Sequence, residues 1–188
     1  MIIGIADELS QQWIKLMKLS PIFILLVSVV FSLNVRASPP NVQTPSPVIY
    51  LADNLDEPDK LGWCIDTKGR GFSERLHAHS CKPQGGDVQF TFDAENGLIK
   101  SVTFNNKCLS KLNANLKTNF GLLECKLGSA LQTFKYIKSN QEFRSMNNDN
   151  NCIVVGKNSR NAGPFMSRDL FLQQCDSIEP KFKKWVIK

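Results

Sequence analysis

Three stretches bounded by cysteines decide the fold: CIDTKGRGFSERLHAHSC (residues 64–81), CLSKLNANLKTNFGLLEC (108–125) and CIVVGKNSRNAGPFMSRDLFLQQC (152–175). The first cysteines of successive stretches are 44 residues apart, and so are Cys81 and Cys125. Phe90 and Phe134 repeat at the same interval. Several markers that share one period indicate a unit that occurs three times, with the third copy lengthened between its cysteines.

Each copy of the unit has the pattern of about four short strands. Apolar residues alternate with polar ones before each second cysteine, as Leu76 and Ala78 do before Cys81, and this alternation is typical of a half-buried strand. The same period predicts that His77 and His79 point to one face. An aromatic residue opens another strand further along each copy, at Phe90, Phe134 and Trp185.

These strands predict an all-β fold, because no segment has a convincing helical period. Three like units are too few for a long solenoid. Closing them into a barrel with pseudo-threefold symmetry removes the exposed strand edges and lets the three aromatic residues share one core. The expected architecture is therefore a β-trefoil.

The threefold repeat also selects the disulfides. Six cysteines allow many pairings, but only one set treats the three units alike and closes short loops: Cys64–Cys81, Cys108–Cys125 and Cys152–Cys175. Each bridge is expected to stabilise the fold by roughly 3 kcal/mol, less any strain. No metal site is expected, because the cysteines lack the clustered spacing of metal ligands.

The N-terminal residues predict export. An apolar run over 21–33, PIFILLVSVVFSL, follows Lys15 and Lys18 and precedes a cleavage pattern with the cut between Ala37 and Ser38. The run is short for a bilayer core, so a cleaved signal peptide over 1–37 is favoured over a membrane anchor, with Met17 as an alternative start. All six cysteines follow the cut, which fits a secreted chain, extracellular or periplasmic.

The mature chain divides into two parts. Residues 38–60 are proline-rich and then acidic, and we interpret them as a linker that leads into a strand at 48–51. Residues 61–188 form the predicted trefoil, with repeats at about 61–104, 105–148 and 149–188. The formal charge of +6 favours anionic surfaces, but it is also typical of an ordinary solvated exterior.

The first repeat resembles a known family. WCIDT (63–67), HSC (79–81) and GGDVQF (85–90) are similar to the first repeat of ricin-type (R-type) lectin domains, and especially to the lectin module of the polypeptide GalNAc-transferases. The resemblance covers 61–188. The family's Gln-x-Trp signature is altered, since only Gln132 keeps the glutamine at the three corresponding places.

The resemblance implies a sugar site in this repeat. Such a site needs a carboxylate that accepts hydrogen bonds from neighbouring sugar hydroxyls, a flat ring against the sugar's C–H face, and a further polar group. Asp66 matches the carboxylate, His79 stands at the place of the ring, and Asp87 at the place of an asparagine. Lys82 matches a position that adds a polar contact. Asp87 would repel Asp66 unless Lys82 or protonated His79 lies between them, and Asp66 could instead bond only to its own turn.

The other two repeats lack these groups. Ser110 and Val154 stand at the carboxylate position, and Leu123 and Gln173 stand at the ring position. The resemblance therefore implies a lectin with a single galactose- or GalNAc-type site and no cofactor. It would meet membranes only through surface glycans and would not bind nucleic acid. It could be free-standing or the targeting subunit of a larger assembly.

Two other classes of function were weighed against a lectin. An enzyme is disfavoured, because no nucleophile–base motif, nucleotide loop or metal-ligand spacing is present. The stronger rival is a trefoil that binds a protein partner or a polyanion, the latter through six lysines: Lys135, Lys138, Lys181, Lys183, Lys184 and Lys188. A polyanion binder would weaken steeply with salt, whereas a neutral-sugar site would not.

Overall fold

The computed structural model describes residues 38–113 and 119–188. The predicted signal peptide over 1–37 lies outside these residues. Among the helices of the described segments, none has the length and apolar character needed to cross a membrane.

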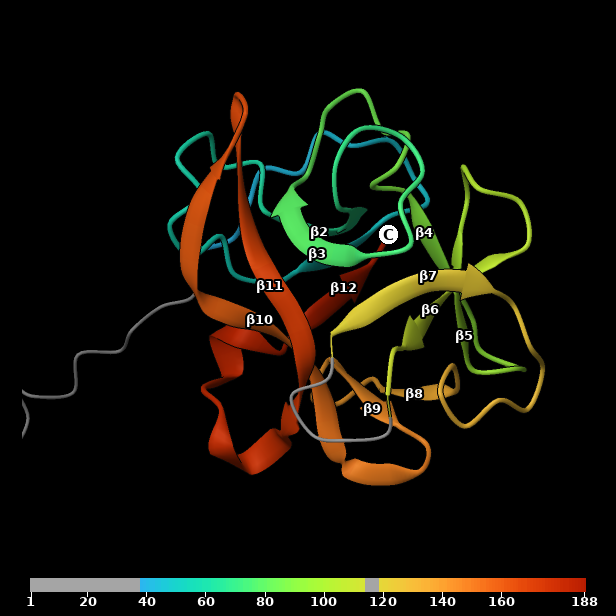
Figure 1. Ribbon diagram of the computed structural model, residues 1–188. Coiled ribbons are helices and arrows are strands. Elements are labelled where there is room, and N and C mark those ends of the chain that lie inside the picture. The colour runs from blue at the N-terminus through green and yellow to red at the C-terminus, as the bar shows by residue number, and fades with distance from the viewer. Residues whose placement is uncertain (1–37, 114–118) are drawn as a thin grey trace, which may run out of the picture. The chain divides into compact units, whose positions relative to one another are not determined.

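The described residues form twelve strands, which fall into three sets of four along the chain (Figure 1). The first set is β1 (Ile49–Leu51), β2 (Trp63–Thr67), β3 (Leu76–Ser80) and β4 (Phe90–Asp93). The second is β5 (Leu98–Ser101), β6 (Lys107–Lys111), β7 (Phe120–Glu124) and β8 (Phe134–Ile137). The third is β9 (Glu142–Ser145), β10 (Asn148–Ala162), β11 (Phe165–Gln174) and β12 (Trp185–Ile187), with the 3₁₀ turns η1 (Cys175–Ser177) and η2 (Pro180–Phe182) before β12.

The strand pairing gives the β-trefoil that the repeat predicts. The second and third strands of every set form an antiparallel hairpin: β2–β3, β6–β7 and β10–β11. The fourth strand of one set pairs with the first strand of the next, as β4–β5 and β8–β9. The last strand returns to the first, with Ile187 opposite Ile49. The pairings form an eight-stranded sheet in the order β12-β1-β2-β3-β11-β10-β9-β8 and a four-stranded sheet in the order β4-β5-β6-β7.

The N-terminal segment differs from the prediction. Residues 38–60 are packed against the trefoil, and β1 within them pairs with β12 and β2. Glu57 is buried and accepts hydrogen bonds from the Leu61 N–H (2.7 Å) and the Ser80 hydroxyl (3.0 Å). The strand expected at 48–51 is present as β1, while the acidic part of the segment, which suggests a solvated run, supplies the buried acceptor Glu57. The first repeat accordingly begins one strand earlier than residue 61.

The core is built around the repeated aromatic residues. Phe90, Phe134 and Trp185 open β4, β8 and β12 and are at most 1% exposed. They belong to one cluster with the apolar residues of the hairpins. Burying a large side chain of this kind contributes about 2–3 kcal/mol to the free energy of unfolding. The repeat thus brings three of the largest stabilising contributions into one core cluster.

The three disulfides fix the hairpins individually. They join Cys64 to Cys81, Cys108 to Cys125, and Cys152 to Cys175, with chain separations of 17, 17 and 23 residues. These are the local pairs that the repeat selects. The longer separation in the third repeat gives a longer hairpin, which is the main departure from threefold symmetry.

That third hairpin extends alongside the first repeat (Figure 1). In β11, Ser167 lies opposite His79 of β3, and Arg168 lies opposite Ala78. Arg168 is 3% exposed, donates to the Gly156 and Lys157 carbonyls where the register of β10 shifts, and pairs with Asp56. Its guanidinium also lies over the Trp63 ring, 4.7 Å from the centroid. These contacts hold the hairpin against β2 and β3.

Candidate functional site

The strand register identifies equivalent positions in the three hairpins. Opposite the first cysteine of each hairpin lie His79, Leu123 and Gln173. Two residues further along, Asp66 faces His77, Ser110 faces Gly121, and Val154 faces Phe171. Only the first repeat therefore combines a carboxylate with two imidazoles at these positions.

The structure brings the four candidate residues of the first repeat together. Lys82 Nζ lies 2.9 Å from Asp66 Oδ2 and 2.7 Å from Asp87 Oδ1. His79 Nδ1 lies 3.5 Å from the same oxygen of Asp66. The ammonium thus lies between the two acids and offsets the repulsion between them, although the Asp87 charge still acts to raise the pKa of Asp66.

Asp66 is not where the family pattern placed it. Its side chain is 1% exposed and lies beneath His77, His79 and Lys82. The sugar site that the resemblance implies needs a carboxylate within reach of the ligand, whereas this carboxylate is buried. Its Oδ2 lies 2.9 Å from Lys82 Nζ, 3.5 Å from His79 Nδ1 and 4.0 Å from His77 Nε2, so side chains of the first repeat cover it. Asp66 can instead position the ammonium of Lys82.

Burial shifts the pKa values in this cluster. It raises the pKa of Asp66 to about 6, against the opposing effect of the Lys82 charge. Burial and the neighbouring charge of His79 lower the pKa of His77 to about 4, and burial also lowers the pKa of His79. For Lys82, burial acts to lower the pKa, but the carboxylates of Asp87 and Asp66 outweigh it and raise the pKa. At neutral pH the cluster holds a charged lysine beside neutral imidazoles.

These shifts predict opposing effects of pH on stability. The folded pKa of His77 is depressed from 6.5 to about 4, so its contribution is present above pH 6.5 and is lost as the pH falls toward 4. The folded pKa of Asp66 is raised from 3.8 to about 6, so its contribution is present below pH 3.8 and is lost as the pH rises toward 6. Each group changes the free energy of unfolding by at most about 1.4 kcal/mol per pH unit, and between pH 4 and 6 the two largely cancel.

Asp66→Asn is therefore expected to make stability fall more steeply on acidification than in the wild type. Urea unfolding at several pH values between 4 and 7 measures this. Asp176→Asn, at an exposed position of η1, should keep the wild-type profile. Parallel profiles for the wild type and Asp66→Asn would contradict the assignment.

A cavity of about 550 Å³ lies over the cluster. Its walls include Arg70, His79 and Lys82 of the first repeat and residues 162–165 at the tip of the β10–β11 hairpin. Phe165 packs edge-on against His79, with ring centroids 5.5 Å apart. The cavity therefore has an aromatic ring in its lining besides His79, and this ring comes from the third repeat.

Sequence reasoning missed Phe165 as a site residue. The signal that could have found it is the lengthened interval between Cys152 and Cys175, which places extra residues at a hairpin tip. His77 and Arg70 also line the cavity and were not assigned to the site from the sequence; the His77 ring lies 5.3 Å from that of His79, on the same face as predicted.

The third repeat has a cavity of its own, of about 460 Å³, lined by Phe171 and Gln173 among others. The position equivalent to Asp66 is Val154, which is fully buried. In the second repeat the equivalent pair is Ser110 and Gly121. Neither hairpin therefore supplies a lysine–carboxylate pair where the first repeat has one.

The C-terminal lysines do not form one exposed cationic patch. Lys183 is 8% exposed, donates to the Cys175 carbonyl (2.6 Å) and pairs with Glu142 (3.0 Å). Lys181 pairs with Glu179 at 3.1 Å. The predicted polyanion surface is wrong at Lys183, because η2 turns that side chain inward.

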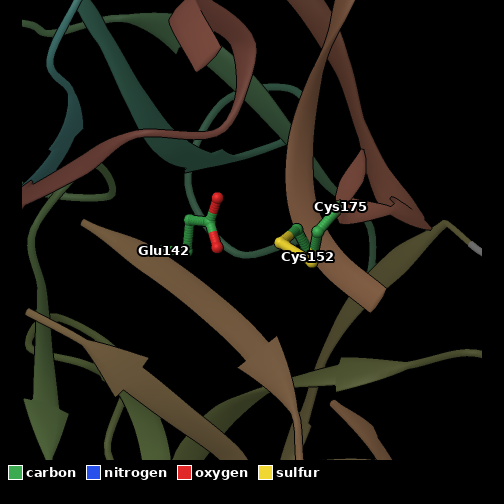
Figure 2. A group of neighbouring side chains, drawn as sticks. All are labelled: Glu142, Cys152 and Cys175. Atoms are coloured by element: carbon green, nitrogen blue, oxygen red, sulfur yellow. A yellow bond between two sulfur atoms is a disulfide. The ribbon is translucent and has the colours of Figure 1, made fainter. Parts of the chain in front are cut away.

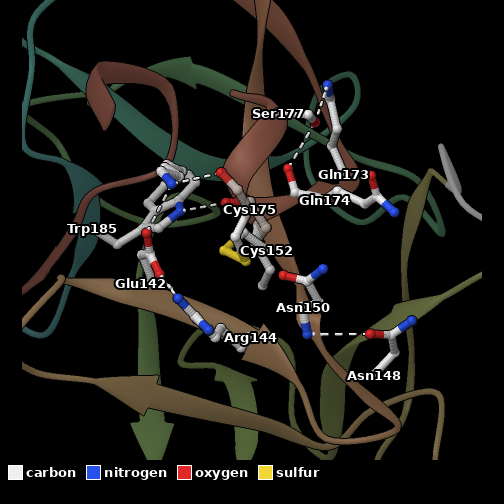
Figure 3. The surroundings of a disulfide bond; sticks show 12 residues. Glu142, Arg144, Asn148, Asn150, Cys152, Gln173, Gln174, Cys175, Ser177 and Trp185 are labelled. Atoms are coloured by element: carbon white, nitrogen blue, oxygen red, sulfur yellow. Dashed lines mark hydrogen bonds and ion pairs between the residues drawn. A yellow bond between two sulfur atoms is a disulfide. The ribbon is translucent and has the colours of Figure 1, made fainter. Parts of the chain in front are cut away.

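Glu142 also lies beside the third disulfide (Figure 2). Ligand atoms of Glu142, Cys152 and Cys175 lie within 4.8 Å of one another, but both sulfurs are used in the disulfide and cannot act as thiolate ligands. The Glu142 carboxylate pairs with Arg144 at 2.6 Å (Figure 3). This group is a structural ion-pair network next to a disulfide.

Comparisons with known proteins point to one family. The family model of the ricin-type β-trefoil lectin domain matches residues 56–184. Among solved structures, the chain is similar to a crystal structure of GalNAc-T7 with UDP, GalNAc and Mn²⁺, at 21% identity and a TM-score of 0.48. That match covers 67% of this chain and only 20% of the other. No curated protein sequence matches.

Proposed function

The chain belongs to the family of ricin-type β-trefoil lectin domains, and from this premise we propose that it binds a sugar in the cavity between the first and third repeats. One observation carries the proposal: this cavity joins a charged donor, Lys82, an imidazole, His79, and an aromatic ring, Phe165. Concave sites with a few converging polar groups and an apolar wall are typical of ligand binding.

Each group has a distinct task in this proposal. Lys82 donates to sugar hydroxyls, and its two carboxylate partners hold the ammonium in place. His79 Nδ1 lies 3.0 Å from the Ser80 carbonyl, and the imidazole also hydrogen-bonds to the Ala162 backbone; these two contacts fix the ring beside Lys82. Phe165 offers an apolar surface to the C–H face of the sugar. Asp66 and Asp87 each form an ion pair with the Lys82 ammonium and orient it toward the cavity.

We further propose a terminal galactose or GalNAc as the sugar and a secreted, extracellular or periplasmic location for the protein. The three disulfides are compatible with export, and residues 1–37 would be the signal peptide removed before Ser38. The activity proposed is binding, with no cofactor and no catalysis. With one site, useful avidity on a cell surface would need self-association or a partner subunit.

Phe165→Ala is expected to weaken sugar binding about 5- to 10-fold, because an aromatic contact is worth about 1 kcal/mol beyond simple burial. A glycan array identifies the sugar, and calorimetric titration of the chain with it measures the loss. Phe72→Ala is the matched control, since Phe72 is also an accessible ring, 48% exposed, and packs on Phe104. Equal loss in both variants, or no glycan bound, would refute the proposed site.

A further inference from the structure

A small cationic cavity adjoins the proposed sugar site. It has a volume of about 40 Å³, and its lining includes Lys68, Arg75, His77 and Arg160. His77 lines the larger cavity as well, so the two spaces share a wall. A water molecule needs roughly 15 Å³ of such space, so the small cavity suits a compact group rather than a sugar ring.

The charges around this cavity are poorly balanced. Within residues 38–113 and 119–188, neither Lys68 nor Arg75 has a carboxylate within ion-pair distance. The two residues flank the β2–β3 loop and are held together by a backbone hydrogen bond from Lys68 N–H to the Arg75 carbonyl (2.8 Å). Asp169 is the acid in the lining, and it pairs with Arg160 at 2.9 Å. Positive charge therefore remains in excess.

His77 supplies the second, independent observation. Its side chain is 9% exposed, and its Nε2 is buried, lies 4.0 Å from Asp66 Oδ2 and has no hydrogen-bond partner among the described residues. A buried polar atom left unpaired is costly, by about 1–3 kcal/mol. An oxygen of a bound group would satisfy this nitrogen when it carries the proton.

We propose that the preferred ligand is a glycan with an anionic substituent, a sulfate or a carboxylate, next to the sugar that occupies the larger cavity. This inference rests on the proposed function and names its ligand class. The neutral ring lies between Lys82 and Phe165, and the anionic group is bound by Lys68, Arg75 and Arg160 across the His77 wall. Hydrogen bonds between charged groups are shorter and stronger than neutral ones.

The charge distribution favours a single anionic group over a long polyanion. Lys68, Arg75 and Arg160 all line one small cavity. Toward the C-terminus the chain offers Lys183, which is buried, and Lys181, which is already paired with Glu179. An extended polyanion would need a longer track of unpaired cations.

The test compares lactose, 3′-sulfolactose and 3′-sialyllactose by calorimetric titration of the full chain. At least one of the two charged sugars is expected to bind about tenfold more tightly than lactose, and the pair distinguishes sulfate from carboxylate. The preference should decrease with added salt, whereas lactose binding should not. Heparin serves as the extended polyanion.

The variant Lys68→Gln/Arg75→Gln is expected to reduce the preference to less than about twofold while leaving lactose affinity unchanged. Its control, Lys138→Gln/Lys188→Gln, removes two exposed cations elsewhere and should keep the full preference. Equal binding of all three sugars, or an equal loss in the control, overturns the anionic-substituent proposal and leaves the lectin proposal standing. Binding of heparin with no binding of any of the three sugars overturns both.

Discussion

Replacement of Glu142 by leucine is expected to lower the free energy of unfolding by about 4 kcal/mol. Glu142 is 4% exposed at the start of β9 and pairs with Arg144 at 2.6 Å and Lys183 at 3.0 Å (Figure 3). Burial acts to raise the pKa of Glu142, but the hydrogen bonds from Arg144 and Lys183 outweigh it and lower the pKa. Removing one partner of a buried pair leaves an uncompensated charge and costs about 3–5 kcal/mol.

The charge left behind belongs to Lys183. Its side chain is 11% exposed, and the Cys175 carbonyl alone would remain as its partner. Arg144 suffers less, because its side chain is 23% exposed and can be solvated. The predicted cost therefore comes mainly from one buried ammonium beside the Cys152–Cys175 disulfide.

A double variant separates this cause from simple loss of packing. Glu142→Leu/Lys183→Met removes both charges and should recover at least half of the lost stability, since apolar replacements of buried pairs are often close to neutral. Glu124→Leu, whose side chain is 71% exposed and lies 3.9 Å from Lys107, should change stability by less than about 0.5 kcal/mol. Urea unfolding of the three variants measures the differences. A double variant no more stable than Glu142→Leu would contradict the argument.

The architecture could be predicted because its determinants are local and repeated. Each cysteine pair closes one hairpin, and each of Phe90, Phe134 and Trp185 enters the same core position by symmetry. The spacing of 44 residues between equivalent cysteines was therefore enough to predict both the fold and the disulfide pairs. The alternation that placed His77 and His79 on one face is a local property of a strand.

The site could be predicted only in part, because its walls come from different repeats. Asp66, His79, Lys82 and Asp87 lie close in sequence and are brought together by one hairpin. Phe165 reaches them from a hairpin tip far along the chain, through the pairing of β11 with β3. Asp66 is buried beneath His77, His79 and Lys82, and the alternation of apolar and polar residues does not predict that burial. Tertiary contacts of this kind override local expectations.

The packing of residues 38–60 against the trefoil could not be predicted, for a related reason. Its composition is that of a linker, but β1 pairs with both β12 and β2, and Glu57 is used as a buried acceptor. Buried acidic residues are rare unless they are paired, so composition alone predicts exposure. The partner that changes this outcome, Ser80, lies in β3 and was not visible from the segment itself.

Lys82→Met is expected to weaken sugar binding about 10- to 100-fold. The ammonium lines the proposed sugar cavity and is oriented by Asp66 and Asp87. A hydrogen bond from a charged donor contributes about 1.5–3 kcal/mol, which corresponds to this range of affinity. Titration with the sugar identified on the array measures it. Lys100→Met removes a lysine paired with Asp93 at 2.6 Å that does not line the cavity, and it should bind as the wild type does.

Loss of binding must be separated from loss of folding, and Asp66 makes this possible. The positive charge of Lys82 and its hydrogen bond lower the pKa of Asp66, against the effect of burial. Without Lys82 this pKa should therefore rise above its present value of about 6. At pH 5 the acid is then neutral, and the stability deficit of Lys82→Met should be smaller than at pH 7. A variant that is folded at pH 5 and still fails to bind, while the wild type binds at that pH, assigns the loss to the missing ammonium. Wild-type affinity in Lys82→Met would instead mean that the sugar is held by other groups.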